Sequence, residues 1–301
     1  MCFFWGTTYL AIRIAVETFP PLLLVGVRFF VSGVILLTAA RVAKLPMPSA
    51  WDWLNSAIFG LLMLGVGNTT LSYAETRIPS GIAAVFITTT PFWMVGLEAI
   101  VPGGERLRLP TVAGLLIGLA GAVLLIGPDA LTTGFRGDRV WGFVILQFSC
   151  VSWSVGSIIL RRRGAHVNAV VSGAIQQLAV GAVFLPLALG LGQRPTEWSA
   201  RGVWSIVYLV IFGSIVGYTS YVYALHKLPV AILTIHTYVN PVVASALGWL
   251  VLAEAFGWRE AAGMAIIFGG VAVVKAFNGH SAPPQPPVTP GVNPSQVLSR
   301  P

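Results

Sequence analysis

Arg28 is the residue whose type and place in the sequence could do the most chemistry. It lies about seven residues into an apolar segment, and an Arg near the centre of a membrane helix costs about 2.5–3.5 kcal/mol on insertion scales. Two interpretations account for such a residue. In the first, the side chain lies inside the protein, where it attracts a solute carboxylate or closes a path. In the second, its long side chain extends to the lipid headgroups.

Pro91 and Pro241 mark a second polar region, because each lies near the middle of an apolar segment, at 80–101 and 230–252. Proline frees the carbonyl four residues earlier, here Ile87 and Thr237, and in lipid such breaks face protein or a wet cavity. Polar residues precede both prolines, namely Thr88, Thr89 and Thr90 in one segment and Thr234, His236, Thr237, Tyr238 and Asn240 in the other. The prolines therefore predict two cavity walls, with a simple helix kink as the alternative.

A few further groups could act at the same depth. His236 is the only titratable residue near the predicted midplane, so it could carry a coupling proton or serve as a hydrogen-bonded interface residue. Trp5, Tyr9 and Arg13 share one helix face, which either lines a path or packs. Glu75 and Glu105 are assigned to loops.

The amino-acid composition indicates which class of protein positions these residues. Only 9% of the 301 residues are charged and 56% are hydrophobic, whereas a soluble domain carries about 25% charged residues. The net charge of +8 comes from basic residues scattered between apolar runs, which is typical of topology signals and not of nucleic-acid binding. The chain is therefore predicted to be an all-α integral membrane protein.

Catalytic and metal-binding motifs are missing from the sequence. The two cysteines, Cys2 and Cys150, allow neither a disulfide framework nor a zinc site. There is no phosphate-binding loop, His-Glu-x-x-His helix or nucleophile elbow. We expect no enzyme activity, no cofactor and no metal.

Apolar segments long enough to cross a bilayer indicate ten transmembrane helices. Seven stretches contain no Asp, Glu, Lys or Arg, at 53–74, 78–97, 109–128, 140–160, 164–193, 202–226 and 228–253, and about 20 apolar residues cross the hydrocarbon core. Weaker segments lie at about 2–17, 22–41 and 259–277. The first gives only about 24 Å of helix, which suggests a start further upstream.

The second half of the sequence repeats the first. Residues 73–79 return as 223–229, Pro91 returns as Pro241, and Gly114 and Gly121 return as Gly263 and Gly270. At an offset of 148, Gly33 matches Gly181 and Arg28 matches Gln176. Because each repeat holds five spans, the copies would sit inverted in the membrane, as in alternating-access transporters.

Charge distribution predicts the orientation. Lys and Arg are more frequent in the loops that lie inside when the N-terminus is cytoplasmic, and Arg161, Arg162 and Arg163 form the strongest cluster. Both termini are then cytoplasmic. The predicted regions are a first repeat at 1–128, a second at 140–277, and a Pro-rich tail at 279–301 that we expect to be disordered.

The sequence also resembles the EamA family of the drug/metabolite transporter superfamily. The matching motifs are Trp5-Gly6-Thr7-Thr8-Tyr9, Phe19-Pro20-Pro21, Val27-Arg28-Phe29, Gly67-Asn68, Pro79-Ser80-Gly81-Ile82-Ala83-Ala84 and Tyr238-Val239-Asn240-Pro241-Val242-Val243-Ala244. The resemblance covers about 2–277 and implies efflux of small organic solutes, such as amino acids, related metabolites or drugs, across the bacterial inner membrane. It also implies a central cavity between the repeats.

These observations define a predicted substrate site at the midplane. Its residues are Arg28, Thr89, Pro91, Gln177, His236, Tyr238 and Asn240, with Trp5, Trp93 and Trp153 against the apolar part of the substrate. The expected partners are a small-molecule substrate, the lipid bilayer and a proton as candidate coupling ion, in a monomer or homodimer. A lipid-linked or nucleotide-sugar translocator of the same superfamily is the principal alternative; a channel or structural protein and an intramembrane enzyme are the others.

Overall fold

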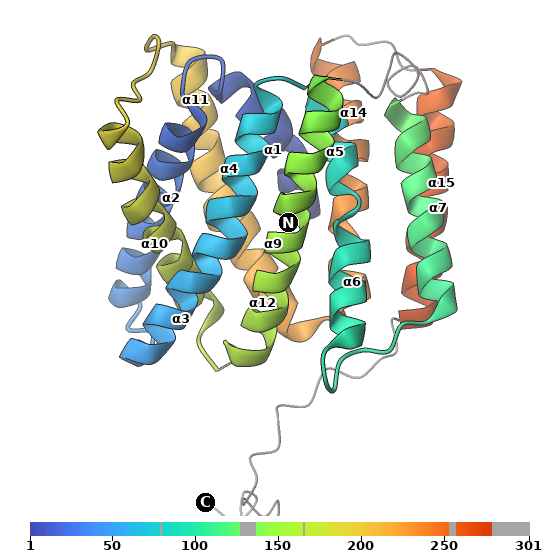
Figure 1. Ribbon diagram of the computed structural model, residues 1–301, viewed down its shortest axis with the longest axis horizontal. Coiled ribbons are helices and arrows are strands. Elements are labelled where there is room, and N and C mark those ends of the chain that lie inside the picture. The colour runs from blue at the N-terminus through green and yellow to red at the C-terminus, as the bar shows by residue number, and fades with distance from the viewer. Residues whose placement is uncertain (79, 127–136, 165, 253–256, 279–301) are drawn as a thin grey trace, which may run out of the picture.

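The computed structural model describes residues 1–78, 80–126, 137–164, 166–252 and 257–278, and throughout these residues the secondary structure is helical. The helices stand side by side in one bundle (Figure 1). The predicted tail at 279–301 lies outside the described residues.

The first half of the chain, to residue 126, supplies one set of helices. They are α1 (Cys2–Ala15), α2 (Pro21–Val42), α3 (Ala50–Gly60), the π-helix η1 (Leu61–Val66), α4 (Gly67–Glu75), α5 (Ser80–Ile87), α6 (Thr90–Ile100) and α7 (Leu109–Ile126). The second half supplies α9 (Asp138–Arg163), α10 (Ala169–Gly190), α11 (Ala200–Tyr208), the π-helix η2 (Leu209–Tyr218), α12 (Thr219–Lys227), α13 (Val230–Leu233), α14 (His236–Leu252) and α15 (Trp258–Asn278).

Length and hydropathy support a membrane protein. Within the described residues, six helical segments are long and apolar enough to cross a membrane, at Pro21–Val42, Ala50–Glu75, Ile82–Ile100, Val140–Arg163, Ala169–Gly190 and Ala200–Lys227. Three shorter apolar helices lie at Leu109–Leu124, Val230–Val243 and Ala261–Phe277. The prediction of an all-α membrane protein is confirmed.

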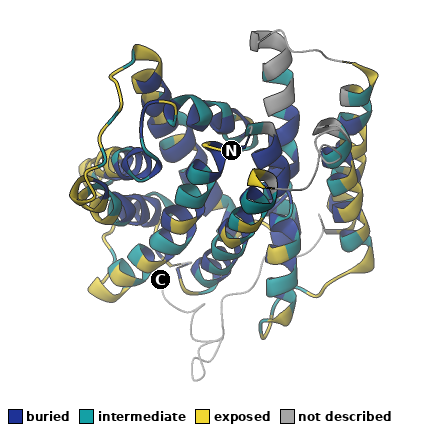
Figure 2. Ribbon diagram, turned by 45° about the horizontal axis from the view of Figure 1, so that its top comes forward, coloured by how far each residue is buried: buried dark blue, intermediate teal, exposed yellow. Residues whose placement is uncertain are grey.

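The outer surface of the bundle is also apolar. Figure 2 shows that buried residues lie on the inward sides of the helices and exposed residues on their outward sides and ends. Large apolar side chains such as Ile35, Leu116 and Phe148 are exposed on these outward sides. A surface of this kind suits lipid tails and not water.

Two π-helical stretches occupy matched places in the halves. η1 and η2 begin at Leu61 and Leu209, which are 148 positions apart. Each lies within a long continuous span, α3–η1–α4 or α11–η2–α12. π-helical turns inside α-helices are rare and occur often at functional sites, and both stretches contribute residues to the cavity described below.

Two helix pairs pack with their backbones in close contact, α2 against α10 and α7 against α15. A Cβ atom at Gly33 would collide with the backbone of Leu178, and one at Gly181 would collide with the backbone of Phe30. Small residues permit this approach between membrane helices. The α7–α15 pair is built in the same way, with Gly114 and Gly118 against Gly270.

The direction of these pairs follows from the same contacts. Along α2, Gly26 meets Leu185 and Gly33 meets Leu178, so α2 and α10 run antiparallel. Gly114 meets Val274 and Gly121 meets Ile267, so α7 and α15 are antiparallel too. In these two pairs, helices that correspond in the sequence repeat therefore run in opposite directions.

The two proline-containing segments break at different places. α5 ends at Ile87 and α6 begins at Thr90, so Pro91 stands in the first turn of α6. The freed Ile87 carbonyl accepts a hydrogen bond from the Thr90 hydroxyl at 2.7 Å. In the second half the break between α13 and α14 comes at residues 234–235, and Pro241 lies inside α14.

The glycine contacts predict a position-specific effect on stability. Replacing Gly181 by Leu forces a side chain into the backbone of α2 and should lower stability by about 1–3 kcal/mol or more. Gly190 on the same helix has no atom within 4 Å of its would-be Cβ, so Gly190→Leu is the matched control. Thermal unfolding of the detergent-purified protein measures both; equal melting temperatures for the two variants would contradict the packing described here.

Candidate functional site

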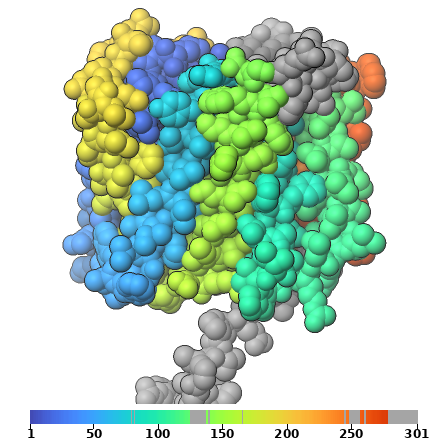
Figure 3. Space-filling view, viewed as in Figure 1, coloured from blue at the N-terminus to red at the C-terminus, as the bar shows by residue number. Residues whose placement is uncertain are grey.

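The bundle encloses a central cavity lined by both halves of the chain. About 710 Å³ of space not filled by atoms lies within it, the open solvent at its mouth included. Its walls come from α1, α2, η1, α4, α5, α6, α9, η2 and α14. Figure 3 shows the face where α9 packs between α3–α4 and α6, behind which the cavity lies.

The cavity walls combine one cation with hydroxyl, amide and aromatic groups. The lining residues are Trp5, Thr8, Tyr9, Ile12, Arg28, Phe29, Leu64, Gly67, Asn68, Leu71, Ile87, Thr90, Ser149, Cys150, Trp153, Gly213, Tyr218, His236, Thr237 and Asn240.

Arg28 points into the bundle and not toward the headgroups. The residue is 5% exposed, and its Nε donates to Ser214 Oγ at 2.8 Å while Nη1 donates to Asn68 Oδ1 at 3.3 Å. Gly213 leaves room for the guanidinium, because a Cβ there would lie 2.7 Å from Nη2. No carboxylate of the described residues pairs with Arg28. The positive charge inside the cavity therefore has neutral partners only.

Aromatic rings form an apolar part of the cavity wall, in contrast to the charged Arg28. Trp5 lies 5.5 Å from Trp153, 5.2 Å from Tyr221 and 5.0 Å from His236, measured between ring centroids. Trp5 Nε1 donates to the Gly213 carbonyl at 3.0 Å, and Trp153 Nε1 donates to the Tyr221 hydroxyl at 3.0 Å. Their polar atoms are thus occupied, and the ring faces offer an apolar surface of fixed shape.

The first turns of α14 supply polar groups. His236 is buried and its Nδ1 lies 2.8 Å from the Leu233 carbonyl, which is the hydrogen-bonded arrangement that the sequence left as an alternative to proton carriage. Asn240 is also buried, and its Oδ1 has no hydrogen-bond partner among the described residues. An acceptor free at a cavity wall can receive a hydrogen bond from a solute.

Half of the predicted site residues line this cavity: Arg28, His236, Asn240, Trp5 and Trp153. The structure places the others in the surrounding walls. Thr89 Oγ1 donates to Gln147 Oε1 at 3.0 Å, and Trp93, which is 40% exposed, donates to the same oxygen at 2.9 Å.

The remaining predicted residues are buried between helices. Gln177 Oε1 accepts from Ser32 at 2.6 Å, and Tyr238 donates to the Leu115 carbonyl at 2.9 Å. Pro91 is buried at the start of α6. None of these three lines the cavity in this conformation.

Other cavity residues had no assigned role in the sequence. Asn68 belongs to the Gly67-Asn68 motif and sits in an apolar segment, and this was the signal that could have identified it. Ser149 and Cys150 lie on α9, where a Ser-Cys pair among apolar residues carries no pattern that distinguishes a cavity wall from a helix interface.

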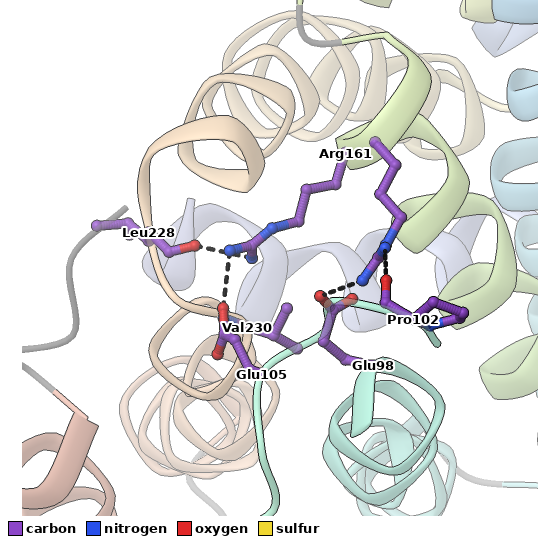
Figure 4. A network of polar contacts seen from close by, with 7 residues as sticks. Glu98, Pro102, Glu105, Arg161, Leu228 and Val230 are labelled. Carbon is purple, nitrogen blue, oxygen red and sulfur yellow. Dashed lines mark hydrogen bonds and ion pairs between the residues drawn. The ribbon is translucent and has the colours of Figure 1, made fainter. Parts of the chain in front are cut away.

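One end of the bundle is held by ionic and main-chain contacts (Figure 4). Arg161, at the end of α9, donates to Glu105 Oε1 at 2.7 Å and to the Leu228 carbonyl at 2.9 Å. Glu105 in turn accepts from the Val230 amide at 3.1 Å. These bonds tie the α6–α7 connection to α9 and to the α12–α13 connection.

A second pair lies beside the first. Arg162 donates to Glu98 Oε1 at 3.1 Å and to the Pro102 carbonyl at 2.8 Å. The side chains of Arg161 and Glu98 are 4% and 5% exposed, whereas those of Glu105 and Arg162 are both 31% exposed, so each pair joins a buried group to a partly exposed one. We call Glu98, Glu105, Arg161 and Arg162 the ionic closure.

Comparisons with known proteins agree with this architecture. The chain is 34% identical over 288 residues to the uncharacterized inner membrane transporter YedA of Escherichia coli strain K12, covering 95% of this chain and 91% of YedA. It is 26% identical to Protein PecM of Dickeya dadantii, covering 90% of this chain and 88% of PecM. A solved crystal structure superposes with a TM-score of 0.75 at 26% identity, covering 93% of this chain and 96% of that one.

The family assignment rests on both halves of the sequence. The model described as the EamA-like transporter family matches residues 1–127 and 140–276, the two regions in which the sequence repeat was found. The chain belongs to the EamA-like transporter family.

Proposed function

We propose that this protein is a secondary transporter that exports small organic metabolites bearing a carboxylate, such as amino acids or related compounds, by alternating access across the cytoplasmic membrane. The observation that carries the proposal is the buried Arg28 guanidinium, which lines a cavity shared by both halves and has no carboxylate partner among the described residues.

The substrate class follows from the chemistry of the walls. A guanidinium forms charge-assisted hydrogen bonds to a carboxylate, and burial away from water strengthens them. The Trp5 and Trp153 rings suit an apolar side chain, and the free Asn240 Oδ1 suits an ammonium or hydroxyl donor. An amphipathic amino-acid-like solute matches all of these groups.

The proposed scaffold is ten spans in two inverted repeats. The antiparallel packing of α2 on α10 and of α7 on α15 supports it, since these helices are counterparts in the repeat. In the first half, the five proposed spans are α1, α2, α3–η1–α4, α5–α6 and α7. Such a scaffold can rock one repeat against the other around a central site.

The ionic closure is the proposed gate on the cytoplasmic side. It contains Arg161 and Arg162 of the basic cluster that the positive-inside rule assigns to the cytoplasm. Opening that side would require the Arg161–Glu105 and Arg162–Glu98 pairs to separate. The same orientation puts both termini in the cytoplasm.

A lipid-linked or nucleotide-sugar translocator is the rival function. A polar headgroup carrying phosphates calls for several basic residues in the pocket, whereas among the described residues Arg28 is the only Lys or Arg that lines this cavity. The single cation favours a solute with one carboxylate.

Flux measurements test the transport proposal. Purified protein in liposomes should accelerate the movement of at least one member of a panel of radiolabelled amino acids, compared with protein-free liposomes. Lipid scrambling is measured in parallel with fluorescent phospholipids. Scrambling without amino acid movement would show that the rival function is the correct one.

Arg28 should control affinity more than folding. Arg28→Gln introduces the residue that stands at the matched position of the second half, and loss of hydrogen bonds to a charged group of about 1.5–3 kcal/mol should raise KM roughly 10- to 100-fold. Arg41→Gln at the exposed end of α2 is the control. An unchanged KM in Arg28→Gln, with both variants equally well folded by size-exclusion chromatography, would leave Arg28 a structural residue.

The gate can be tested with Cys150 as a built-in reporter, because this thiol lines the cavity. In a Cys2→Ser background, Glu105→Gln should speed labelling of Cys150 by a membrane-impermeant maleimide added from the cytoplasmic side. Weakening the closure by about 1 kcal/mol would raise the open population about fivefold.

Asp52→Asn is the matched control for this experiment, since Asp52 pairs at 2.9 Å with His166, whose side chain is 61% exposed, near the same end of the bundle. It should leave the labelling rate unchanged. Equal acceleration by both substitutions would mean that surface charge, and not the closure, limits access.

A further inference from the structure

Glu75 is a buried carboxyl group that the transport site described above does not use. The sequence assigned it to a loop; this is wrong, because Glu75 is the last residue of α4 and is fully buried. Neither of its side-chain oxygens has a hydrogen-bond partner among the described residues. A buried and unpaired carboxylate costs several kcal/mol, so such a group takes up a proton unless a cation reaches it.

The matched position of the second half shows that packing does not require an acid there. Residues 73–79 correspond to 223–229, so Glu75 corresponds to Leu225. Leu225 is fully buried in the hydrophobic core. A leucine therefore fits this place in the fold without the cost of desolvating a carboxyl group, and the acid in the first half needs another explanation.

The nearest cation is held close to the carboxyl group without pairing with it. Arg13 of α1 donates from Nη1 to the main-chain carbonyl of Glu75, and no ion pair joins the two side chains. The surroundings seen here suit the neutral acid. A turn of the Arg13 side chain from the main-chain carbonyl toward the carboxylate would suit the anion.

Most of the charged or titratable groups around Glu75 on the neighbouring helices are engaged with other partners. Tyr9 of α1 interacts with it electrostatically. On α2, Arg28 is bonded to Asn68, about two turns before Glu75 on α4. On α9, Asp138 is paired with Arg77 at 3.6 Å, and Cys150 is bonded by Thr90. The neighbouring α5 and η1 contain no titratable residue.

Glu75 does not line the cavity itself but follows a residue that does. Leu71 precedes it by four residues, so it sits one turn earlier on the same face of α4, and Leu71 lines the cavity together with Tyr9 and Ile12 of α1. A movement of α1 against α4 would thus change the substrate cavity and the surroundings of Glu75 together.

We propose that the Glu75 carboxyl group is a proton-binding site that couples proton movement to solute transport. The group holds its proton in the conformation seen here. It releases the proton when α1 and α4 separate, as water enters and Arg13 turns from the main-chain carbonyl to the carboxylate. This inference rests on the proposed transport function.

Proton binding can be measured without any substrate. Infrared difference spectra of the reconstituted protein, recorded across a pH titration, should contain the C=O stretching band of a protonated buried carboxyl group. The band should be absent from Glu75→Gln. It should persist in Glu98→Gln, which changes another buried carboxyl group. A band that remains in Glu75→Gln would overturn the proposal.

Coupling is measured with a pH-sensitive dye inside the same liposomes while a gradient of the amino acid panel is applied. The wild-type protein should change the internal pH as solute moves. Glu75→Gln, and Glu75→Leu with the residue of the second half, should let solute move down its gradient with no such change. If Glu75→Gln alters internal pH as the wild type does, coupling through this residue is wrong.

The two measurements separate the two proposals. Loss of the infrared band in Glu75→Gln, combined with no solute movement in the wild type, would support the proton site and refute the transport of this solute class. His236→Gln is a further arm: loss of coupling in that variant with coupling intact in Glu75→Gln would assign the proton to the cavity histidine instead.

Discussion

Lipid offers no hydrogen bonds, so each polar group enclosed by this bundle must be satisfied by the protein or by what the protein binds. Most enclosed groups follow that constraint: Gln177 bonds to Ser32, Tyr238 to a main-chain carbonyl, and the freed Ile87 carbonyl to Thr90. Some buried side-chain atoms depart from it, those of Thr69 and Thr219 among them, and three departures involve a charged group or the cavity. Arg28 has neutral partners only, Asn240 leaves an acceptor free, and Glu75 has no partner for its carboxyl group among the described residues. These three groups are the proposed binding sites for solute and proton.

The sequence predicted the family, the helical class and the helix break beside Pro91, because each depends on local composition or on spacing along the chain. It did not predict which face of a helix meets the cavity. A membrane helix is apolar both toward lipid and toward its neighbours, so periodicity, which separates core from surface in soluble proteins, is weak here. Gln177 and Tyr238 were expected at the substrate for this reason, and they bond within the walls.

Two further differences concern particular residues. The break in the second half comes before Pro241, where the Thr234 and Thr237 hydroxyls bond to the main-chain carbonyls of Ala231 and Thr234. Glu75 was assigned to a loop because charged residues near the end of a span usually meet water. Its burial depends on the packing of α4 against α1 and α9, which is tertiary information that no local pattern contains.

The repeat clarifies why these groups are asymmetric. At matched positions the scaffold is kept: Gly33 and Gly181 bring α2 and α10 together, and η1 and η2 begin 148 residues apart. Yet in the sequence repeat Arg28 corresponds to Gln176, and Glu75 corresponds to Leu225. A two-fold scaffold alone would treat its two ends alike. Placing one cation at the cavity and one buried acid one turn beyond its lining in a single half makes the two ends chemically different, and such a difference is what the proposed coupling of solute to proton requires.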